Sequence, residues 1–222
     1  MYLSGTTTEF FKDLKQDDRI HGVLFNTWRK TAREQEALKA GCLFGVDNGI
    51  FSNRFIERQW LTRLWDFWKY RHNCLVCPLP DFLYYLPDGT VRGDWRKTLD
   101  RFHQYKSVTK RMGFPVTLVT QDGLTPDNTP WSEIDAIFIG GSNYHKRGLE
   151  AEYLGLEAKR RGVYVHIGRV SSVTAAARFW PWADSYDGTT YTYEPDRRYE
   201  EYLPQWREFF NATDRPYQFK LV

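Results

Sequence analysis

Short apolar stretches of the sequence are each followed by polar residues or by glycine. Six such signatures occur in order along the chain: Asp47-Asn48-Gly49, Asp81, Gln121-Asp122-Gly123, Gly140-Gly141-Ser142, Gly168-Arg169 and Asp187-Gly188-Thr189. Asp, Asn and Gly also make good turns and helix caps, which would explain any one signature alone. Six in succession, each directly after an apolar run, favour a shared functional site.

The carboxylates of these signatures suggest glycosidic chemistry. One of two carboxylates facing a sugar carbon can attack it, while the other handles the proton of the departing and arriving groups. A further carboxylate and an amide in a dry pocket could pair with a purine, because the wrong base would leave buried polar groups unpaired. Metal-dependent hydrolysis is the alternative, since it also uses several aspartates at strand ends.

The elements that must position these residues alternate between strands and helices. After a polar start and an apolar run at 21–25, we predict strands over 42–46, 73–80, 116–120, 136–139, 163–167 and 184–187. Apolar residues at helical spacing and closing glycines predict helices over 31–40, 54–70, 94–112, 148–161, 173–179 and 198–210. We expect a loop with Pro-Asp-Gly turn chemistry between the strand at 73–80 and the next helix.

This alternation predicts an α/β protein with a parallel sheet. There are about seven strand–helix pairs, near the eight of a closed barrel but in fewer residues than the ~250 that are typical. We therefore expect a compact, complete or incomplete (β/α)8 TIM-type barrel, with an open doubly wound sheet as the alternative. Residues 1–222 contain no Gly-, Ser- or Pro-rich linker and are interpreted as one catalytic domain. In either fold the carboxyl ends of the strands would bring the signatures to one mouth.

Composition leaves the partner open. The chain is 41% hydrophobic and 27% charged, with a net charge of +3 and a pI of about 8.7, which suits a nucleic-acid partner but also a well-mixed solvated surface. The 17% aromatic content, with nine Trp, fits core packing or base stacking. No apolar stretch approaches the ~20 residues of a membrane span and no signal peptide is evident, so we expect a cytoplasmic protein, in the host cytoplasm if phage-encoded.

The three cysteines do not indicate a disulfide framework or a complete metal site. Cys74 and Cys77 have the spacing of half a zinc site, but they lie in an apolar run and no second pair completes four ligands. Buried thiols in a strand are the favoured interpretation. We expect neither a metal nor a cofactor.

The strand ends resemble, in order, those of the tRNA-guanine transglycosylase superfamily. The likeness is greater to its DNA-modifying branch, the DpdA-like deazapurine DNA modification proteins of phages and bacteria. It covers roughly residues 45–190, and its most specific part, 164–189, looks like the family's segment from a Met-Gly turn into the nucleophile strand. The residues Val46-Asp-Asn-Gly-Ile-Phe51 look like the family's Asp-Ser-Gly-Gly-Phe turn.

The resemblance implies a two-step base exchange. Asp187 matches the nucleophile that attacks C1′ and releases guanine, with Asp184 as the alternative. A 7-deazaguanine such as 7-cyano-7-deazaguanine then displaces the enzyme with the help of Asp47, which matches the general acid/base. The target base must first leave its stack, at a cost on the order of a few kcal/mol.

The resemblance also implies a base-binding set. Phe51 matches the aromatic residue that stacks on the base, and Ile167 stands where the family often has Met on the other face. Asp81 matches the carboxylate that reads the amino edge of guanine. Gln121 and the pair Gly140-Gly141 match the groups beside the oxygen of the six-membered ring.

Departures from the family favour DNA as the partner. The tRNA enzymes carry a structural zinc site of three cysteines and a histidine after the nucleophile strand, whereas here no cysteine follows Cys77. A barrel without the zinc-binding subdomain lacks the usual tRNA-gripping surface. The alternatives are the same reaction on tRNA, a base-releasing glycosidase, and a non-catalytic nucleic-acid-binding module. The presence of both Asp47 and Asp187 argues against the last.

Basic residues near the signatures are candidates for phosphate contacts. His145, Lys146 and Arg169 stand where they could meet the phosphates around a flipped nucleotide, although lone basic residues are commonly solvated surface. His166, on an apolar strand, is interpreted as a core histidine with a satisfied hydrogen bond.

Overall fold

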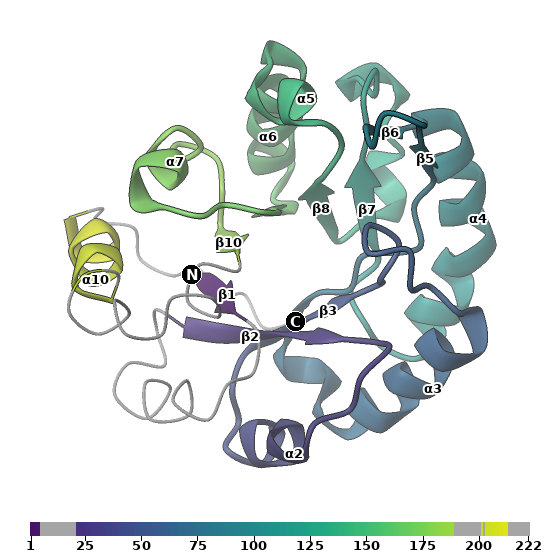
Figure 1. The fold of residues 1–222 in the computed structure, drawn as a ribbon, viewed down its shortest axis with the longest axis vertical. Coiled ribbons are helices and arrows are strands. Elements are labelled where there is room, and N and C mark those ends of the chain that lie inside the picture. The colour runs from purple at the N-terminus through teal and green to yellow at the C-terminus, as the bar shows by residue number, and fades with distance from the viewer. Residues whose placement is uncertain (5–20, 189–200, 202, 213–222) are drawn as a thin grey trace.

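The protein forms an eight-stranded parallel sheet that nearly closes into a barrel (Figure 1). The computed structural model describes residues 1–4, 21–188, 201 and 203–212. The barrel strands are β1 (Tyr2–Ser4), β2 (His21–Asn26), β3 (Phe44–Asp47), β4 (Cys74–Val76), β7 (Thr117–Thr120), β8 (Ala136–Ile139), β9 (Tyr164–Ile167) and β10 (Ser185–Asp187).

Strand pairing follows the order of the chain around a ring. The sheet order is β4-β3-β2-β1-β10-β9-β8-β7, so that β1 joins β2 on one side and β10 on the other. Across the remaining gap, Pro78 forms a parallel bridge with Thr117, and the Leu79 N–H donates to the Thr117 carbonyl at 3.0 Å. The expected incomplete TIM-type barrel is confirmed. An open doubly wound sheet would instead reverse its strand order at a switch point.

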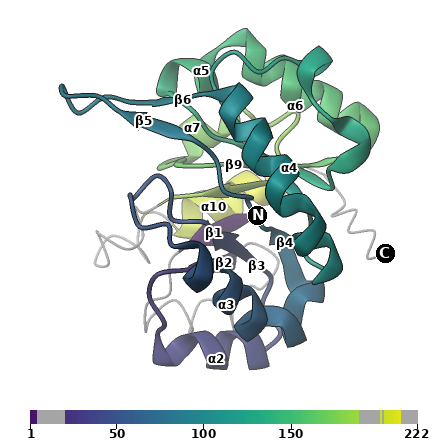
Figure 2. The same cartoon turned by 90° about the vertical axis from the view of Figure 1, so that its right-hand side faces the viewer.

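Helices cover the outside of the ring (Figures 1 and 2). They are α2 (Ala32–Lys39), α3 (Glu57–Phe67), α4 (Trp95–Arg111), α5 (Asn143–Arg147), α6 (Leu149–Arg161), α7 (Val173–Ala177) and α10 (Leu203–Ala212). The connection from β7 to β8 contains only the short 3-10 turns η2 (Pro126–Asn128) and η3 (Trp131–Glu133), which makes the helical layer incomplete. None of the helices in the described ranges combines the length and apolar character that crossing a membrane requires.

Alternation along the strands sorts side chains between two cores. Phe44 and Val46 of β3 face outward into the main core under the helices, whereas Leu3 of β1 belongs to a small cluster with Met1 and Val76 inside the ring. Glycine makes room for this inner cluster. A β-carbon on Gly22 would lie 2.5 Å from the Leu3 side chain and 2.7 Å from the Leu43 carbonyl oxygen. The amino-terminal half of the barrel is therefore solid.

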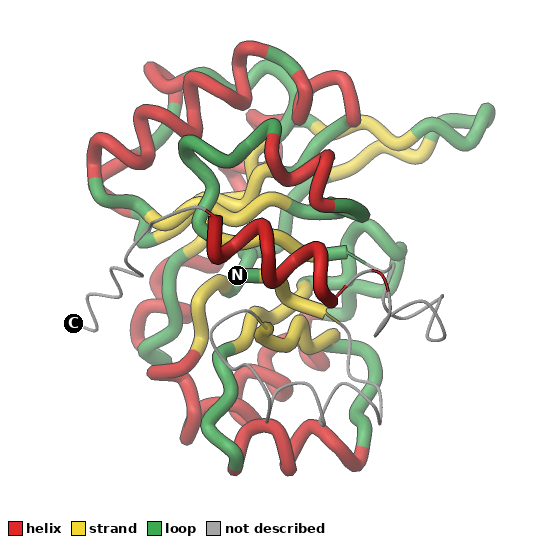
Figure 3. The backbone as a smooth tube through the Cα atoms, turned by 90° about the vertical axis from the view of Figure 1, so that its left-hand side faces the viewer, coloured by secondary structure: helices red, strands yellow, loops and turns green. Residues whose placement is uncertain are grey.

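Several elements differ from the sequence prediction, among them the unpredicted helix α5 and the strand predicted over 73–80, which is shortened to Cys74–Val76. β1 lies within the supposed polar start, and Tyr2 packs under Trp206 of α10 with ring centroids 4.6 Å apart. Figure 3 shows α10 crossing the outside of the sheet where β1 pairs with β10. The loop predicted after Asp81 contains an antiparallel hairpin, β5 (Leu83–Tyr85) and β6 (Val91–Gly93), that projects from the body (Figure 2).

Two predicted helices also have different bounds. The helix predicted over 54–70 ends as an α-helix at Phe67 and continues as the 3-10 helix η1 (Trp68–Asn73). The last helix begins at Leu203, and residues 198–200 of its predicted range lie outside the described residues.

Candidate active site

Three carboxylates gather at the carboxyl ends of the strands. Asp47 ends β3 and Asp187 ends β10, each two positions beyond an inward-facing residue of its strand, Gly45 and Ser185. Asp81 follows β4 and is 6% exposed. Asp187 and Asp81 both raise the pKa of Asp47 by charge repulsion, so the three groups share one electrostatic environment. The structure thus brings together the predicted nucleophile, general acid/base and base-reading carboxylate.

Asp187 is held in a fixed orientation by donors on both of its oxygens. Oδ1 accepts the backbone N–H of Arg169 at 3.0 Å, and Oδ2 lies 2.9 Å from Nε2 of His166. The carboxylate is only 8% exposed. The tautomer of His166 with a proton on Nε2 is the one that can donate to Oδ2. These contacts fix the orientation of the carboxyl group at the strand end.

His166 is the residue whose role the sequence did not reveal. Its ring is fully buried on β9 and lies between Asp187 and Ser185, whose Oγ is 2.7 Å from Nδ1. The expectation of a satisfied core histidine is met in part, because the ring is buried and both nitrogens have partners. However, one partner is the predicted nucleophile. The only sequence signal was alternation, which places His166 and Asp187 on the inner faces of adjacent strands.

The hydrogen bonds and the pKa of Asp47 set it apart from Asp187. Its Oδ1 accepts the backbone N–H of Gly49 at 3.0 Å, within the turn that follows β3. Burial raises the pKa of Asp47 to about 6, the Gly49 hydrogen bond opposes this, and repulsion from Asp187 and Asp81 adds to it. A carboxyl group with this pKa can give and take a proton near neutral pH, which is what a general acid/base requires.

Asp81 anchors a buried polar cluster on the β4 side of the mouth. Its Oδ1 accepts from Nδ2 of Asn48 at 3.1 Å, and its Oδ2 accepts from Nε2 of Gln121 at 2.5 Å. Burial raises the pKa of Asp81 to about 6 against the effect of these hydrogen bonds. Oε1 of Gln121 is buried without a hydrogen-bond partner among the described residues. The carboxyl group of Asp81 as acceptor and Nε2 of Gln121 as donor are together suited to pair with a purine edge that presents both a donor and an acceptor.

A cation–π contact crosses the mouth above these groups. The Arg169 guanidinium lies 4.4 Å from the centroid of the Phe51 ring, and one of its nitrogens donates to the Gly141 carbonyl at 2.6 Å. Phe51 follows β3 and Arg169 follows β9, and these strands lie on opposite sides of the ring. The predicted stacking ring is therefore at the mouth, but Arg169 occupies one of its faces.

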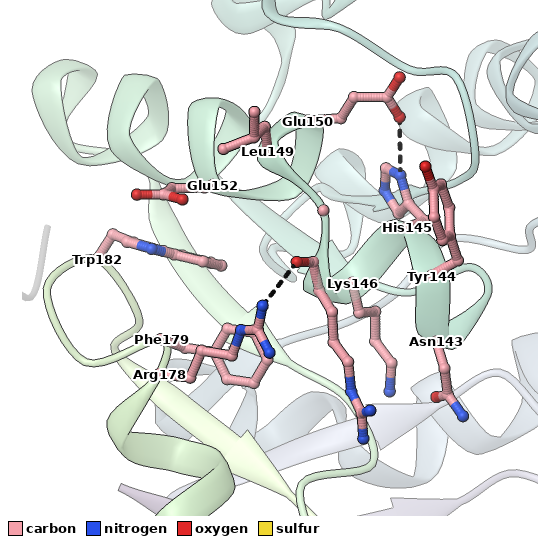
Figure 4. A pocket seen from close by; sticks show the side chains of 12 residues that line it. Asn143, Tyr144, His145, Lys146, Leu149, Glu150, Glu152, Arg178, Phe179 and Trp182 are labelled. Atoms are coloured by element: carbon pink, nitrogen blue, oxygen red, sulfur yellow. Dashed lines mark hydrogen bonds and ion pairs between the residues drawn. The ribbon is translucent and has the colours of Figure 1, made fainter.

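Two other predicted residues lie away from the carboxylates. Ile167 points outward from β9 into the main core, on the opposite face from His166, so the structure does not place it against a base at the mouth. His145 turns toward α6, with Nδ1 3.4 Å from Glu150 (Figure 4), and its other nitrogen is 3.4 Å from the Thr120 hydroxyl. A phosphate contact by His145 gains no support from this geometry.

The glycine pair after β8 stays close to the mouth. A β-carbon on Gly140 would lie 2.8 Å from Val119, and Gly141 has a φ of +72°, where glycine is favoured. Gly141 also accepts the Arg169 hydrogen bond described above. The pair allows β7 and β8 to approach closely and places its backbone beside the mouth.

Asp184, the alternative nucleophile, lies at the other end of β10. Its carboxylate accepts from the backbone N–H of Val165 at 2.9 Å and from Lys159 at 2.5 Å. It therefore fastens the amino-terminal end of the strand, remote from the mouth. Cys74 and Cys77 are free thiols in and just after β4, and burial raises the pKa of both. Within the described ranges, no three His, Cys, Asp or Glu side chains are arranged to hold a metal ion.

Comparison of the chain with protein-family models and with curated proteins finds no match.

Proposed function

We propose that this protein exchanges guanine in DNA for a 7-deazaguanine through a covalent intermediate on Asp187. The observation that carries the proposal is the unlike setting of Asp47 and Asp187 at one barrel mouth. Asp187 is oriented by His166 and by a backbone amide, whereas Asp47 has a pKa raised to about 6. Two carboxyl groups in different environments are the equipment for nucleophilic attack with proton transfer.

The reaction balances with these two groups alone. In the first step an Asp187 oxygen bonds to C1′ as the C1′–N9 bond breaks, and protonated Asp47 supplies the proton that the departing guanine takes up. In the second step the incoming base gives its N9 proton to Asp47, and N9 attacks C1′ as the bond to Asp187 breaks. Asp47 ends protonated, ready for another cycle.

Recognition of the base would use the cluster around Asp81. Asp81 and Gln121 bond to each other in the free protein, and a guanine edge would replace that contact, with Nε2 of Gln121 donating to the oxygen of the base and Asp81 accepting from its amino edge. Stacking on Phe51 requires Arg169 to leave the ring. DNA is preferred to tRNA because the segment after the proposed nucleophile reads Asp187-Gly188-Thr189, whereas the tRNA enzymes of the resembling family have Asp-Cys there.

The test is incorporation of labelled 7-cyano-7-deazaguanine into duplex DNA, with tRNA as a parallel substrate and nucleoside analysis as the readout. Label in DNA supports the proposal. Label in tRNA alone contradicts the substrate, and guanine release without incorporation contradicts the transfer in favour of hydrolysis. The Asp187→Asn variant should lose about 10³-fold or more of the rate while remaining folded.

A further inference from the structure

A second feature lies beside the candidate active site: a basic cavity of about 310 Å³ between α5 and the segment that connects β9 to α7. Four of the side chains lining it are cations, namely Lys146, Arg147, Arg169 and Arg178. We call these four residues the basic pocket. None of the described lining residues is Asp or Glu. The adjacent cavity of about 810 Å³, drawn in Figure 4, differs in including Glu150 and Glu152 in its lining.

Three of the four cations of the basic pocket donate to neutral backbone carbonyls. Lys146 is 6% exposed and its ammonium donates to the Gly168 carbonyl at 2.9 Å. Arg178 donates to the Arg147 carbonyl at 3.1 Å (Figure 4), and Arg169 donates to Gly141. Within the described part of the chain, no member of the basic pocket forms a salt bridge. The positive charge is held in place without a directly bonded carboxylate, and Asp187 acts on Lys146 and Arg169 only from beyond salt-bridge distance.

This arrangement has an electrostatic cost that an anion would remove. Burial, followed by repulsion from Arg169 and Arg147, lowers the pKa of Lys146 to about 8, while Asp187 opposes the shift. A buried charge is costly unless it is paired. Arginine and lysine side chains that converge without carboxylates are typical of phosphate recognition.

We propose that the basic pocket binds one phosphate group. Within the proposed function, on which this placement rests, that group is a phosphodiester beside the flipped nucleotide. Both Lys146 and Arg169 interact electrostatically with Asp187, so a phosphate held by them would lie near the nucleophile. Arg169 connects the two sites, because the side chain that must leave Phe51 also lines the pocket.

The test measures binding rather than exchange. The probe is a DNA oligonucleotide with a single guanine, either fully charged or carrying one neutral methylphosphonate next to that guanine. The test variant is Arg147→Gln with Arg178→Gln, two exposed residues outside the catalytic set. The matched control is Lys110→Gln with Arg111→Gln, which removes the same charge from the exposed end of α4, at the opposite end of the barrel. Thermal unfolding of each variant establishes that it is folded.

We expect the wild type and the control variant to bind the neutral oligonucleotide about tenfold more weakly than the charged one. The pocket variant should bind the two oligonucleotides almost equally. The pocket variant should also reduce the slope of log affinity against log salt by about 0.9 per lost phosphate contact. Two results would overturn the proposal. One is an equal loss of DNA affinity in the pocket and control variants. The other is that the neutral linkage weakens binding to the pocket variant as much as it weakens binding to the wild type.

A second arm separates the sources of the phosphate. Deoxyguanosine monophosphate is titrated against the protein with deoxyguanosine as the uncharged reference. A preference for the monophosphate that disappears in the pocket variant, without any DNA effect, assigns the pocket to a free nucleotide and contradicts its place in the proposed reaction. Because no deazaguanine is present, exchange can fail while the phosphate effect persists, and the two proposals are tested separately.

Discussion

At the scale of single residues, the site gives two aspartates, Asp47 and Asp187, different surroundings. Asp47 and Asp187 are both inward-facing aspartates at strand ends, yet only Asp187 has a ring nitrogen and a backbone amide directed at its oxygens. Asp47 accepts one backbone hydrogen bond and is exposed to the repulsion of two other carboxylates. The division of labour that we propose between nucleophile and acid/base therefore depends on the different surroundings of the two aspartates.

The raised pKa of Asp47 has a consequence for stability. The folded protein binds this proton more tightly than the unfolded chain, where an Asp titrates near ~4. Ionisation of Asp47 therefore destabilises the fold as pH rises from ~4 through 6, and has no such effect below ~4. We expect Asp47→Asn to raise the free energy of unfolding by about 1 kcal/mol at pH 7 and by nothing measurable at pH 4, as checked by urea denaturation.

Asp66 provides a control of opposite sign for this experiment. Burial raises its pKa, but hydrogen bonds from Arg63 and Lys30 outweigh burial, so that the net shift is downward. Asp66→Asn should therefore destabilise the protein at pH 7. A loss of stability on Asp47→Asn at pH 7 would contradict the account of its environment.

At the scale of elements, the β5–β6 hairpin packs against the polar cluster of Asp81 and Gln121, which we propose reads the base. Gly93 of β6 packs against Gln121 so closely that a β-carbon would lie 1.8 Å from Oε1. We expect Gly93→Ala to displace the Gln121 amide and to cost about 1–3 kcal/mol of stability. Discrimination of guanine against adenine in the exchange assay should fall about tenfold or more.

The exposed neighbour Arg92 gives the matched control for the hairpin. Its side chain lies on the same strand and is exposed, so Arg92→Ala should change neither stability nor discrimination appreciably. Equal effects of the two substitutions would show that the hairpin does not act through Gln121.

Much of the order of helices and strands is predictable from the sequence. There are physical reasons why the sequence does not predict β1 and the hairpin. The strands ending at Asp47, Ile139 and Ile167 are apolar runs directly followed by polar or glycine signatures, a local pattern. β1 is only three residues long, and its inclusion depends on pairing with β2 and β10 far along the chain. The hairpin strands β5 and β6 have three residues each, none of them buried, so they lack the buried alternating face that marks a longer strand in a sequence.

The candidate site was predictable where it depended on strand ends. Asp47, Asp81, Gln121 and Asp187 come together because parallel strands place their carboxyl ends at one mouth. The partnership of His166 with Asp187 depends instead on the register between β9 and β10, which composition does not reveal. The motif position alone predicts Ile167 beside the base, whereas the alternation of β9 directs its side chain outward into the main core.

At the scale of the whole molecule, the barrel is narrow, and side chains fill its interior at the amino-terminal ends of the strands. Leu3 occupies space left by Gly22 and Gly45, so that these glycines set the closeness of β1, β2 and β3. The rigid half supports the mouth, where burial raises the pKa of Asp47 and of Asp81. Such a separation of stable and functional ends is general in β/α barrels.

The two glycines should differ in their tolerance of a β-carbon. On Gly22 it would meet the Leu43 backbone oxygen at 2.7 Å, whereas on Gly45 its nearest contacts, at 2.9 to 3.1 Å, are the ends of side chains that can shift. We expect Gly22→Ala to cost about 1–3 kcal/mol and Gly45→Ala to cost less, as measured by urea denaturation. The reverse order would contradict the packing described for the barrel interior.

The central claim, that Asp187 is the nucleophile of a base exchange, is tested most directly by trapping its intermediate. The protein is incubated with guanine-containing DNA without an incoming base, then denatured, digested and analysed by peptide mass spectrometry. The account predicts a nucleotide-linked peptide with the modification on Asp187, and no such peptide from Asp187→Asn. An adduct on another residue, or base exchange by the Asp187→Asn variant, would contradict it.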